Sequence, residues 1–234
     1  MGFELTGKNT LITGATAGIG LAIAKRFVKN GANVIISGRR EEGDAIAQQI
    51  GAHFVQADLS IDDDIEKLFD RAEALLGDLH IVINNAGRIN KGGVIAEQSV
   101  SEFDQVFHLN VRAAYQVLQL AAQRVTAGGS IINTASIVAM SGGAGASAYC
   151  ASKAALVNLT KTAALELASK NIRVNAVSPG LIESEIWDGN IPYEMAKKIV
   201  PMQRVGGGDE VAAVFHFLAS DDSSYVTGAN YLVD

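Results

Sequence analysis

The chain is poor in cysteine, proline and aromatic residues. Its 234 residues include one cysteine, three prolines and 6% aromatic residues. A single cysteine excludes an intramolecular disulfide and agrees with a reducing compartment, so we expect a cytoplasmic protein. Because proline interrupts regular backbone structure, its scarcity predicts few irregular or disordered stretches.

Other features are missing as well. Residues 1–8 contain no basic region followed by an apolar core, which a secretory signal would have. The longest apolar runs are far too short to span a bilayer. The net charge is −6 and Lys and Arg form no dense cluster, so we expect neither a nucleic-acid nor a membrane partner. The four histidines are scattered, and no metal site is expected.

What the sequence does contain is an alternation of strand-like and helix-like segments. We expect strands at residues 9–13, 33–37, 53–56, 80–84, 130–134, 172–177 and 229–233. We expect helices at residues 19–28, 41–50, 65–76, 100–124, 147–168 and 209–219. Such alternation predicts an α/β fold: a single doubly wound (Rossmann) domain over residues 1–234, with a seven-stranded parallel sheet. Residues 181–206 break the rhythm and are expected to form a substrate loop or lid within it.

Residues near several helix ends carry local signals. Ser60 and Asp63 are spaced like a weakened capping box at the start of the third expected helix. Gly31, Gly51 and Gly77 each follow a helix, where a left-handed residue is expected.

Tyr149 and Lys153 form the most informative pair in the chain. Four residues apart on a helix, they lie on one face, and Ser136 precedes Tyr149 by thirteen residues. A lysine cation beside a tyrosine favours the phenolate and is expected to lower the tyrosine pKa from about 10 toward neutrality. Such a group can move a proton on or off an alcohol or carbonyl oxygen. On its own the spacing also fits a surface helix with a partly buried tyrosine.

A glycine-rich turn follows the first strand. Gly14, Gly18 and Gly20 have the spacing G-x-x-x-G-x-G between a strand and a helix. Glycines there let the backbone approach a pyrophosphate, and the helix N-terminus offers unpaired N–H groups and a positive dipole end. A plain strand-to-helix turn is the alternative, but the alternating context favours a dinucleotide.

The end of the second strand bears on which dinucleotide binds. NAD enzymes usually place a carboxylate there for the ribose hydroxyls. This chain has Arg39 and Arg40 instead, and a guanidinium suits a 2′-phosphate. NADP(H) is therefore favoured and NAD(H) remains possible, because Glu41 and Glu42 follow and oppose the positive charge.

Together these motifs closely resemble the classical short-chain dehydrogenase/reductase family over essentially the whole chain. The resemblance implies a catalytic tetrad of Asn110, Ser136, Tyr149 and Lys153. It implies that the cofactor is bound by Gly14, Thr16, Gly18, Ile19, Gly20, Arg39, Asp58, Leu59, Asn85, Ala86, Gly87, Tyr149, Lys153, Pro179, Gly180, Ile182 and Ser184. Ala17 stands where many NADP-preferring members carry a basic residue, which weakens the NADP(H) prediction.

The resemblance also implies roles for the tetrad. Tyr149 protonates the oxygen of a small-molecule carbonyl substrate, and Ser136 orients that oxygen. Lys153 lowers the Tyr149 pKa and holds the nicotinamide ribose, and Asn110 positions a water that links Lys153 to solvent. Asn110 could instead be a buried amide that bonds to the backbone.

The substrate and the assembly are less determined. We expect an enzyme similar to 3-oxoacyl carrier-protein reductases, with a sugar or polyol dehydrogenase, or a non-catalytic dinucleotide-binding protein, as alternatives. Trp187 and Tyr193 are expected walls of the substrate pocket, and His108 and His216 are expected to be structural. A basic patch for a carrier protein would use Arg88, Lys91, Lys197 and Lys198. Because helices 100–124 and 147–168 are apolar on more than one face, we expect a homo-oligomer; the family resemblance implies a tetramer.

Overall fold

The computed structural model describes residues 3–183 and 193–234. Its seven strands form one parallel sheet in the order β3-β2-β1-β4-β5-β6-β7. The strands are β1 (Asn9–Ile12), β2 (Asn33–Gly38), β3 (His53–Gln56), β4 (Leu79–Asn84), β5 (Val125–Thr134), β6 (Arg173–Pro179) and β7 (Asn230–Val233). The strand order reverses direction at β1 and β4, so a crevice is expected at their carboxyl ends. The predicted doubly wound α/β fold is confirmed.

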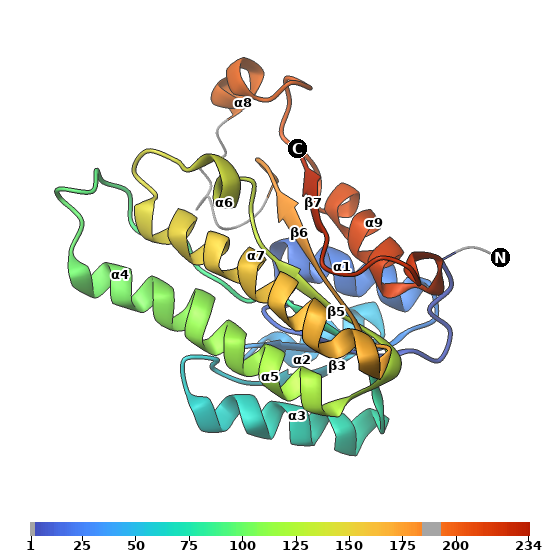
Figure 1. Cartoon of the computed structure of the whole chain (residues 1–234). Coiled ribbons are helices and arrows are strands. Elements are labelled where there is room, and N and C mark those ends of the chain that lie inside the picture. The colour runs from blue at the N-terminus through green and yellow to red at the C-terminus, as the bar shows by residue number, and fades with distance from the viewer. Residues whose placement is uncertain (1–2, 184–192) are drawn as a thin grey trace.

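Helices cover both faces of this sheet (Figure 1). On one face, α1 (Gly18–Lys29), α2 (Gly43–Ile50) and α9 (Gly208–Ala219) share an apolar core with the sheet. On the other, α3 (Asp62–Leu76), α5 (Ala114–Arg124) and α7 (Ser147–Leu167) do the same. Because both faces are buried, the central strands consist almost entirely of buried residues, as β1 and β6 show.

The expected helix 100–124 contains a change of helical type. It begins as α4 (Val100–Phe107), continues as the π-helical segment η1 (His108–Ala113) and ends as α5. Side-chain periodicity shows the helix but not this change in the hydrogen-bond register of the backbone. Single π turns inside α-helices are frequent at functional sites.

Several local expectations are corrected. The capping box at Ser60 is wrong: α3 begins at Asp62 with Ile61 at the N-cap and no side-chain cap, because the Ser60 hydroxyl donates to Asp58 instead. Strand β5 begins at Val125, five residues before the expected start. Gly31, Gly51 and Gly77 have φ of 88°, 77° and 78°, as expected of residues that end helices.

Two short α-helices of the described residues were not expected from the sequence. The first, α6 (Val138–Ser141), follows β5, and the second, α8 (Tyr193–Ile199), belongs to the segment expected as a loop or lid. Figure 1 shows α8 beyond the carboxyl ends of β6 and β7. Among the helices of residues 3–183 and 193–234, none has both the length and the apolar character needed to cross a bilayer.

Candidate active site

A cleft of about 2040 Å³ lies at the carboxyl edge of the sheet, and most of the predicted site residues border it. From the catalytic set these are Ser136, Tyr149 and Lys153. From the cofactor set they are Gly14, Thr16, Gly18, Ile19, Gly20, Arg39, Asp58, Leu59, Asn85, Ala86, Gly87, Pro179, Gly180 and Ile182. Asn110 does not border the cleft, and Ser184 lies outside the described residues.

Tyr149 and Ser136 meet at this cleft from different elements. Ser136 follows the end of β5, and Tyr149 lies in the first turn of α7. Burial raises the Tyr149 pKa above its usual 10, and the hydrogen bond with the Ser136 hydroxyl opposes this rise. The net direction is upward, which contradicts the lowered pKa expected from the sequence.

The reason lies in the position of Lys153. Its Nζ is 5.7 Å from the centroid of the Tyr149 ring, so the cation faces the aromatic ring, and it does not lower the Tyr149 pKa. The helical spacing brings the two side chains together as expected, but burial sets the direction of the Tyr149 pKa shift. The phenol of this tyrosine is protonated at neutral pH, and the raised pKa makes it a weaker acid than a free tyrosine.

Lys153 is itself deeply buried, with 3% of its surface exposed. Its Nζ donates to the Thr134 carbonyl oxygen at 2.7 Å. Burial lowers the Lys153 pKa from 10.5 to about 8, because the interior disfavours the charged form. Two further donor positions of the ammonium remain for a ligand at this end of the cleft.

The Asn110 side chain hydrogen-bonds to the backbone of Arg88 and to the side chain of Ser152. Its Oδ1 accepts from the Arg88 N–H at 2.9 Å, and its Nδ2 donates to the Arg88 carbonyl at 2.8 Å and to Ser152 Oγ at 3.0 Å. A Cβ on Gly87 would lie 3.3 Å from both Asn110 Oδ1 and Lys153 Nζ, so only glycine leaves this approach uncrowded. The buried amide expected as the alternative role is therefore present.

The glycine turn forms the part of the cleft suited to phosphate. A Cβ on Gly14 would lie 2.7 Å from the Ala86 Cα, and one on Gly20 would lie 2.5 Å from the Gly14 carbonyl. Ala17 precedes α1 without a side-chain cap, and the first turn holds no acidic residue. The N–H groups that begin this twelve-residue helix are therefore not used by a cap, and they suit a pyrophosphate.

The second strand ends at the adenosine side of the cleft. Arg39 is exposed, and its Nη1 lies 4.0 Å from Asp58 Oδ2. Two hydrogen bonds from Ser60, at 2.9 Å from its N–H and 2.7 Å from its hydroxyl, fix the Asp58 carboxylate. The backbone bond is the largest cause of the lowered Asp58 pKa. Ser37 Oγ is buried without a protein partner at the same strand end. Together these groups fit an adenosine ribose bearing hydroxyls or a phosphate.

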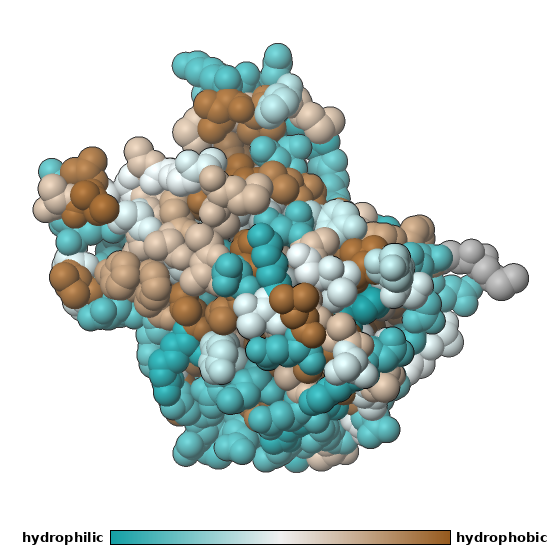
Figure 2. Space-filling view, viewed as in Figure 1, coloured by the Kyte–Doolittle hydropathy of each residue, from teal (hydrophilic) through white to brown (hydrophobic). Residues whose placement is uncertain are grey.

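The substrate side of the cleft differs from the expectation. Tyr193 donates to Glu183 and does not border the cleft, whereas Met195 and Ile199 of α8 do. Trp187 lies outside the described residues. Figure 2 shows apolar surface on α8, and Met195 and Ile199 are both exposed. Sequence reasoning missed these two residues, because no α8 helix was expected.

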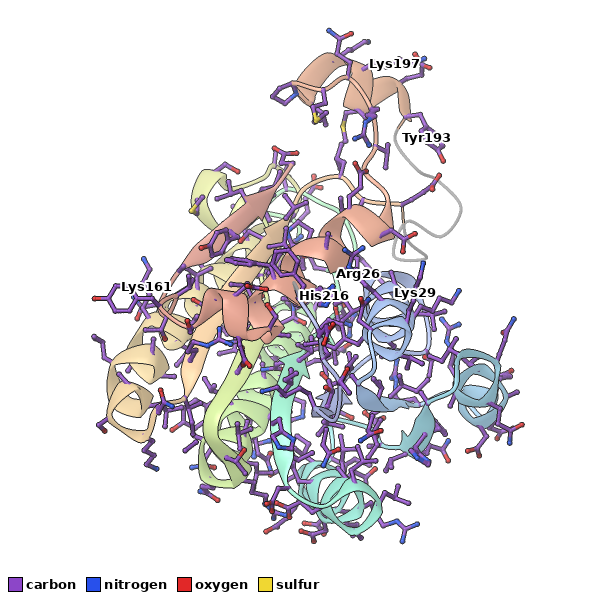
Figure 3. The ribbon with its side chains drawn as sticks, turned by 90° about the vertical axis from the view of Figure 1, so that its right-hand side faces the viewer. Arg26, Lys29, Lys161, Tyr193, Lys197 and His216 are labelled. Atoms are coloured by element: carbon purple, nitrogen blue, oxygen red, sulfur yellow. The ribbon has the colours of Figure 1, made fainter. Side chains whose placement is uncertain are left out.

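Several of the remaining predicted groups have structural partners. Of the expected basic patch, Arg88 binds Glu102 and Gln105, and Lys197 binds Glu194 on the outer side of α8 (Figure 3). His216 accepts from Arg26 Nε at 3.2 Å between α9 and α1, in keeping with a structural role.

His108 likewise has a structural partner, since its Nε2 lies 2.9 Å from the Ser60 carbonyl. Within residues 3–183 and 193–234, His, Cys, Asp and Glu side chains form no group able to hold a metal ion.

Comparison with known proteins identifies relatives along the whole length. A family model described as enoyl-(acyl carrier protein) reductase matches residues 14–234. Nodulation protein G of Rhizobium sp. strain N33 is 38% identical over 233 residues, which cover 97% of this chain and 95% of that protein.

Two solved structures superpose closely on this chain. A short chain dehydrogenase from Burkholderia cenocepacia in complex with NADP has a TM-score of 0.93 at 33% identity, covering 99% of this chain and 98% of that one. A 3-ketoacyl-(acyl-carrier-protein) reductase from Brucella melitensis complexed with NADH has a TM-score of 0.93 at 32% identity, with the same coverage. The matched model, the relative of similar length and the shared fold place this chain in the short-chain dehydrogenase/reductase family of oxidoreductases.

Proposed function

We propose that the protein is a cytoplasmic, NADP(H)-dependent reductase of 3-oxoacyl thioesters. The observation that carries the catalytic assignment is the place of Tyr149 at the cleft, hydrogen-bonded to Ser136 and with Lys153 Nζ 5.7 Å from its ring centroid. In the proposed reduction, the phenol donates its proton to the carbonyl oxygen.

Ser136 and Lys153 have separate roles in the proposed reduction. Ser136 hydrogen-bonds the phenol and can hold the substrate oxygen beside it. Lys153 offers its remaining N–H donors to ribose hydroxyls and supplies positive charge where negative charge develops on the oxygen. A nicotinamide bound at this end of the cleft would supply the hydride. Pro179, Gly180 and Ile182 border the same end and would hold that ring; Ser184, predicted with them, lies outside the described residues.

The preference for NADP(H) rests on Arg39. It is an exposed guanidinium at the end of β2, and its Nη1 lies 4.0 Å from Asp58 Oδ2. A 2′-phosphate would gain charge-assisted hydrogen bonds that a ribose hydroxyl does not. A relative crystallised with NADP and another with NADH support the use of this fold for either cofactor.

The proposed substrate class rests on the substrate side of the cleft. Met195 and Ile199 give that side apolar surface, which suits an acyl chain better than a sugar. The Brucella relative is described as a 3-ketoacyl-(acyl-carrier-protein) reductase, which supports the same class.

Assembly as a homotetramer is part of the proposal. Val100 and Phe103 of α4, Tyr115 of α5 and Leu165 of α7 are exposed apolar side chains on the two long helical segments. Small-angle scattering at micromolar concentration is expected to give the mass of four chains, and a monomer would contradict this part.

The test is a nicotinamide-absorbance screen of acyl thioesters, simple ketones and sugars with NADPH and with NADH. The proposal predicts the highest kcat/KM for a 3-oxoacyl thioester with NADPH. Preferred oxidation of a sugar or polyol would refute the substrate class, and turnover of none of these would refute the catalytic assignment.

A further inference from the structure

The helix that carries Tyr149 and Lys153 has no cap of its own. It begins at Ser147, and the preceding Ala146 has no side-chain group that can accept a hydrogen bond. The first four N–H groups of a helix lack partners within it, and an N-cap side chain normally accepts from the second or third of them. In α7 the third of these N–H groups belongs to Tyr149.

Asn90 provides an acceptor from a distant part of the chain. The Tyr149 N–H donates to Asn90 Oδ1 at 3.3 Å, across 59 residues of sequence. Asn90 lies in the loop that follows β4, is only 5% exposed and borders the cleft together with Tyr149. The loop that follows β4 therefore caps the helix that carries Tyr149.

The amide nitrogen of Asn90 bonds to the backbone just before α7. Its Nδ2 donates to the Gly145 carbonyl at 3.0 Å and to the Lys91 carbonyl at 3.1 Å. Gly145 and Tyr149 flank the uncapped Ala146, so one planar carboxamide bonds to the backbone on both sides of it. Every polar atom of this buried side chain is used, as expected of a group that fixes geometry.

Gln98 holds the same loop without reaching Tyr149. Its Oε1 accepts from Ser147 Oγ at 2.9 Å, and its Nε2 donates to the carbonyls of Gly93 at 3.1 Å and Gly145 at 3.2 Å. It does not border the cleft. Gln98 therefore provides a comparison for Asn90, with similar bonds to the loop but none to the backbone of the catalytic tyrosine.

We infer that Asn90 is a positioning residue that sets the place of Tyr149 against Ser136 by capping α7 from the loop that follows β4. This inference rests on the proposed function, in which Tyr149 is the proton donor. Without the cap, the first turn of α7 can shift, and the phenol shifts with it. A misplacement of about 1 Å at a reacting group can cost about 10²-fold in rate.

The test compares Asn90→Ala with Gln98→Ala. Asn90→Ala is expected to lower kcat by about 10- to 100-fold. The dissociation constant for NADPH should change by less than about twofold, since the glycine turn and Arg39 do not contact Asn90. The Tyr149 amide should exchange its hydrogen faster. Gln98→Ala should keep kcat within about threefold of the wild type and leave the exchange of the Tyr149 amide unchanged.

Two outcomes would overturn the inference. The first is an unchanged kcat in Asn90→Ala when Tyr149→Phe is inactive. The second is an equal loss in Asn90→Ala and Gln98→Ala, which would mean that any loosening of the loop suffices.

Two further measurements keep the inference testable. If the wild type reduces no carbonyl, the proposed function fails, but hydrogen exchange still tests the cap. Unchanged exchange of the Tyr149 amide in Asn90→Ala would then refute the capping role of Asn90. If Asn90→Ala does not fold, Asn90→Ser, whose hydroxyl is too short to reach the Tyr149 N–H, replaces it with the same expected result.

Discussion

Lys153 is an ionisable group whose burial should be measurable in the stability of the protein. Its ammonium is almost fully buried with one protein acceptor, the Thr134 carbonyl, and its pKa is lowered from 10.5 to about 8. Between these two pH values the unfolded chain holds a proton that the folded protein has released. The free energy of unfolding therefore rises with pH in this window, since the unfolded state binds more protons.

The size of the effect follows from the shift. One pKa unit corresponds to about 1.4 kcal/mol, so the protonated lysine costs the folded state about 3 kcal/mol at pH 7. Lys153→Met removes the titrating group. We expect the unfolding free energy of the wild type, relative to this variant, to increase by about 2 to 3 kcal/mol between pH 7 and pH 10. Other titrating groups occur in both proteins and cancel.

The measurement is urea unfolding followed by circular dichroism at several pH values between 7 and 10. Lys161 lies on the same helix and is exposed (Figure 3), so Lys161→Met serves as the control and should show no such trend. A wild-type-minus-variant difference that stays flat with pH, or that falls, would refute the reasoning. It would mean that the Lys153 cation is stabilised in the folded protein by groups other than Thr134.

Two further predictions concern the cofactor side. Gly20→Ala places a Cβ 2.5 Å from the Gly14 carbonyl oxygen and 2.6 Å from Asn85 Nδ2, so thermal unfolding should show a free energy of unfolding lower by about 2 to 4 kcal/mol. Gly92→Ala is the control, because a Cβ there would have no atom within 4 Å, and its stability should equal that of the wild type. Equal stability of the two variants would contradict the crowding at Gly20. Arg39→Ala should raise the NADPH dissociation constant about 10-fold or more and that of NADH by less than about threefold, and equal losses would remove the 2′-phosphate argument.

Much of the fold follows from sequence because its signals are local or periodic. The alternation of apolar runs with helical spacing located every strand and every long helix. Gly31, Gly51 and Gly77 marked three helix ends, since only a residue that accepts positive φ fits there. The failures are where tertiary contacts compete with local signals. Ser60 has the residue type of a cap, but its hydroxyl bonds to Asp58 instead.

The sequence predicted which residues form the site, but not the direction of the Tyr149 pKa shift. The spacing of Tyr149 and Lys153 brings them onto one helix face, and their strand-end partners meet them at one edge of the sheet. The direction of the Tyr149 pKa shift could not be obtained this way, because it depends on the burial of the phenol, which helical spacing does not show. Asn90 had no motif to reveal it, since its contact with Tyr149 spans 59 residues.

The central claim is that the Tyr149 phenol donates a proton to the reduced substrate, and Tyr149→Phe tests it most directly. The account predicts that this variant folds and binds NADPH with an affinity within about twofold of the wild type. With the best substrate from the screen, its kcat should fall by about 10²- to 10⁴-fold. Retention of most of the wild-type turnover, with cofactor binding intact, would contradict the account.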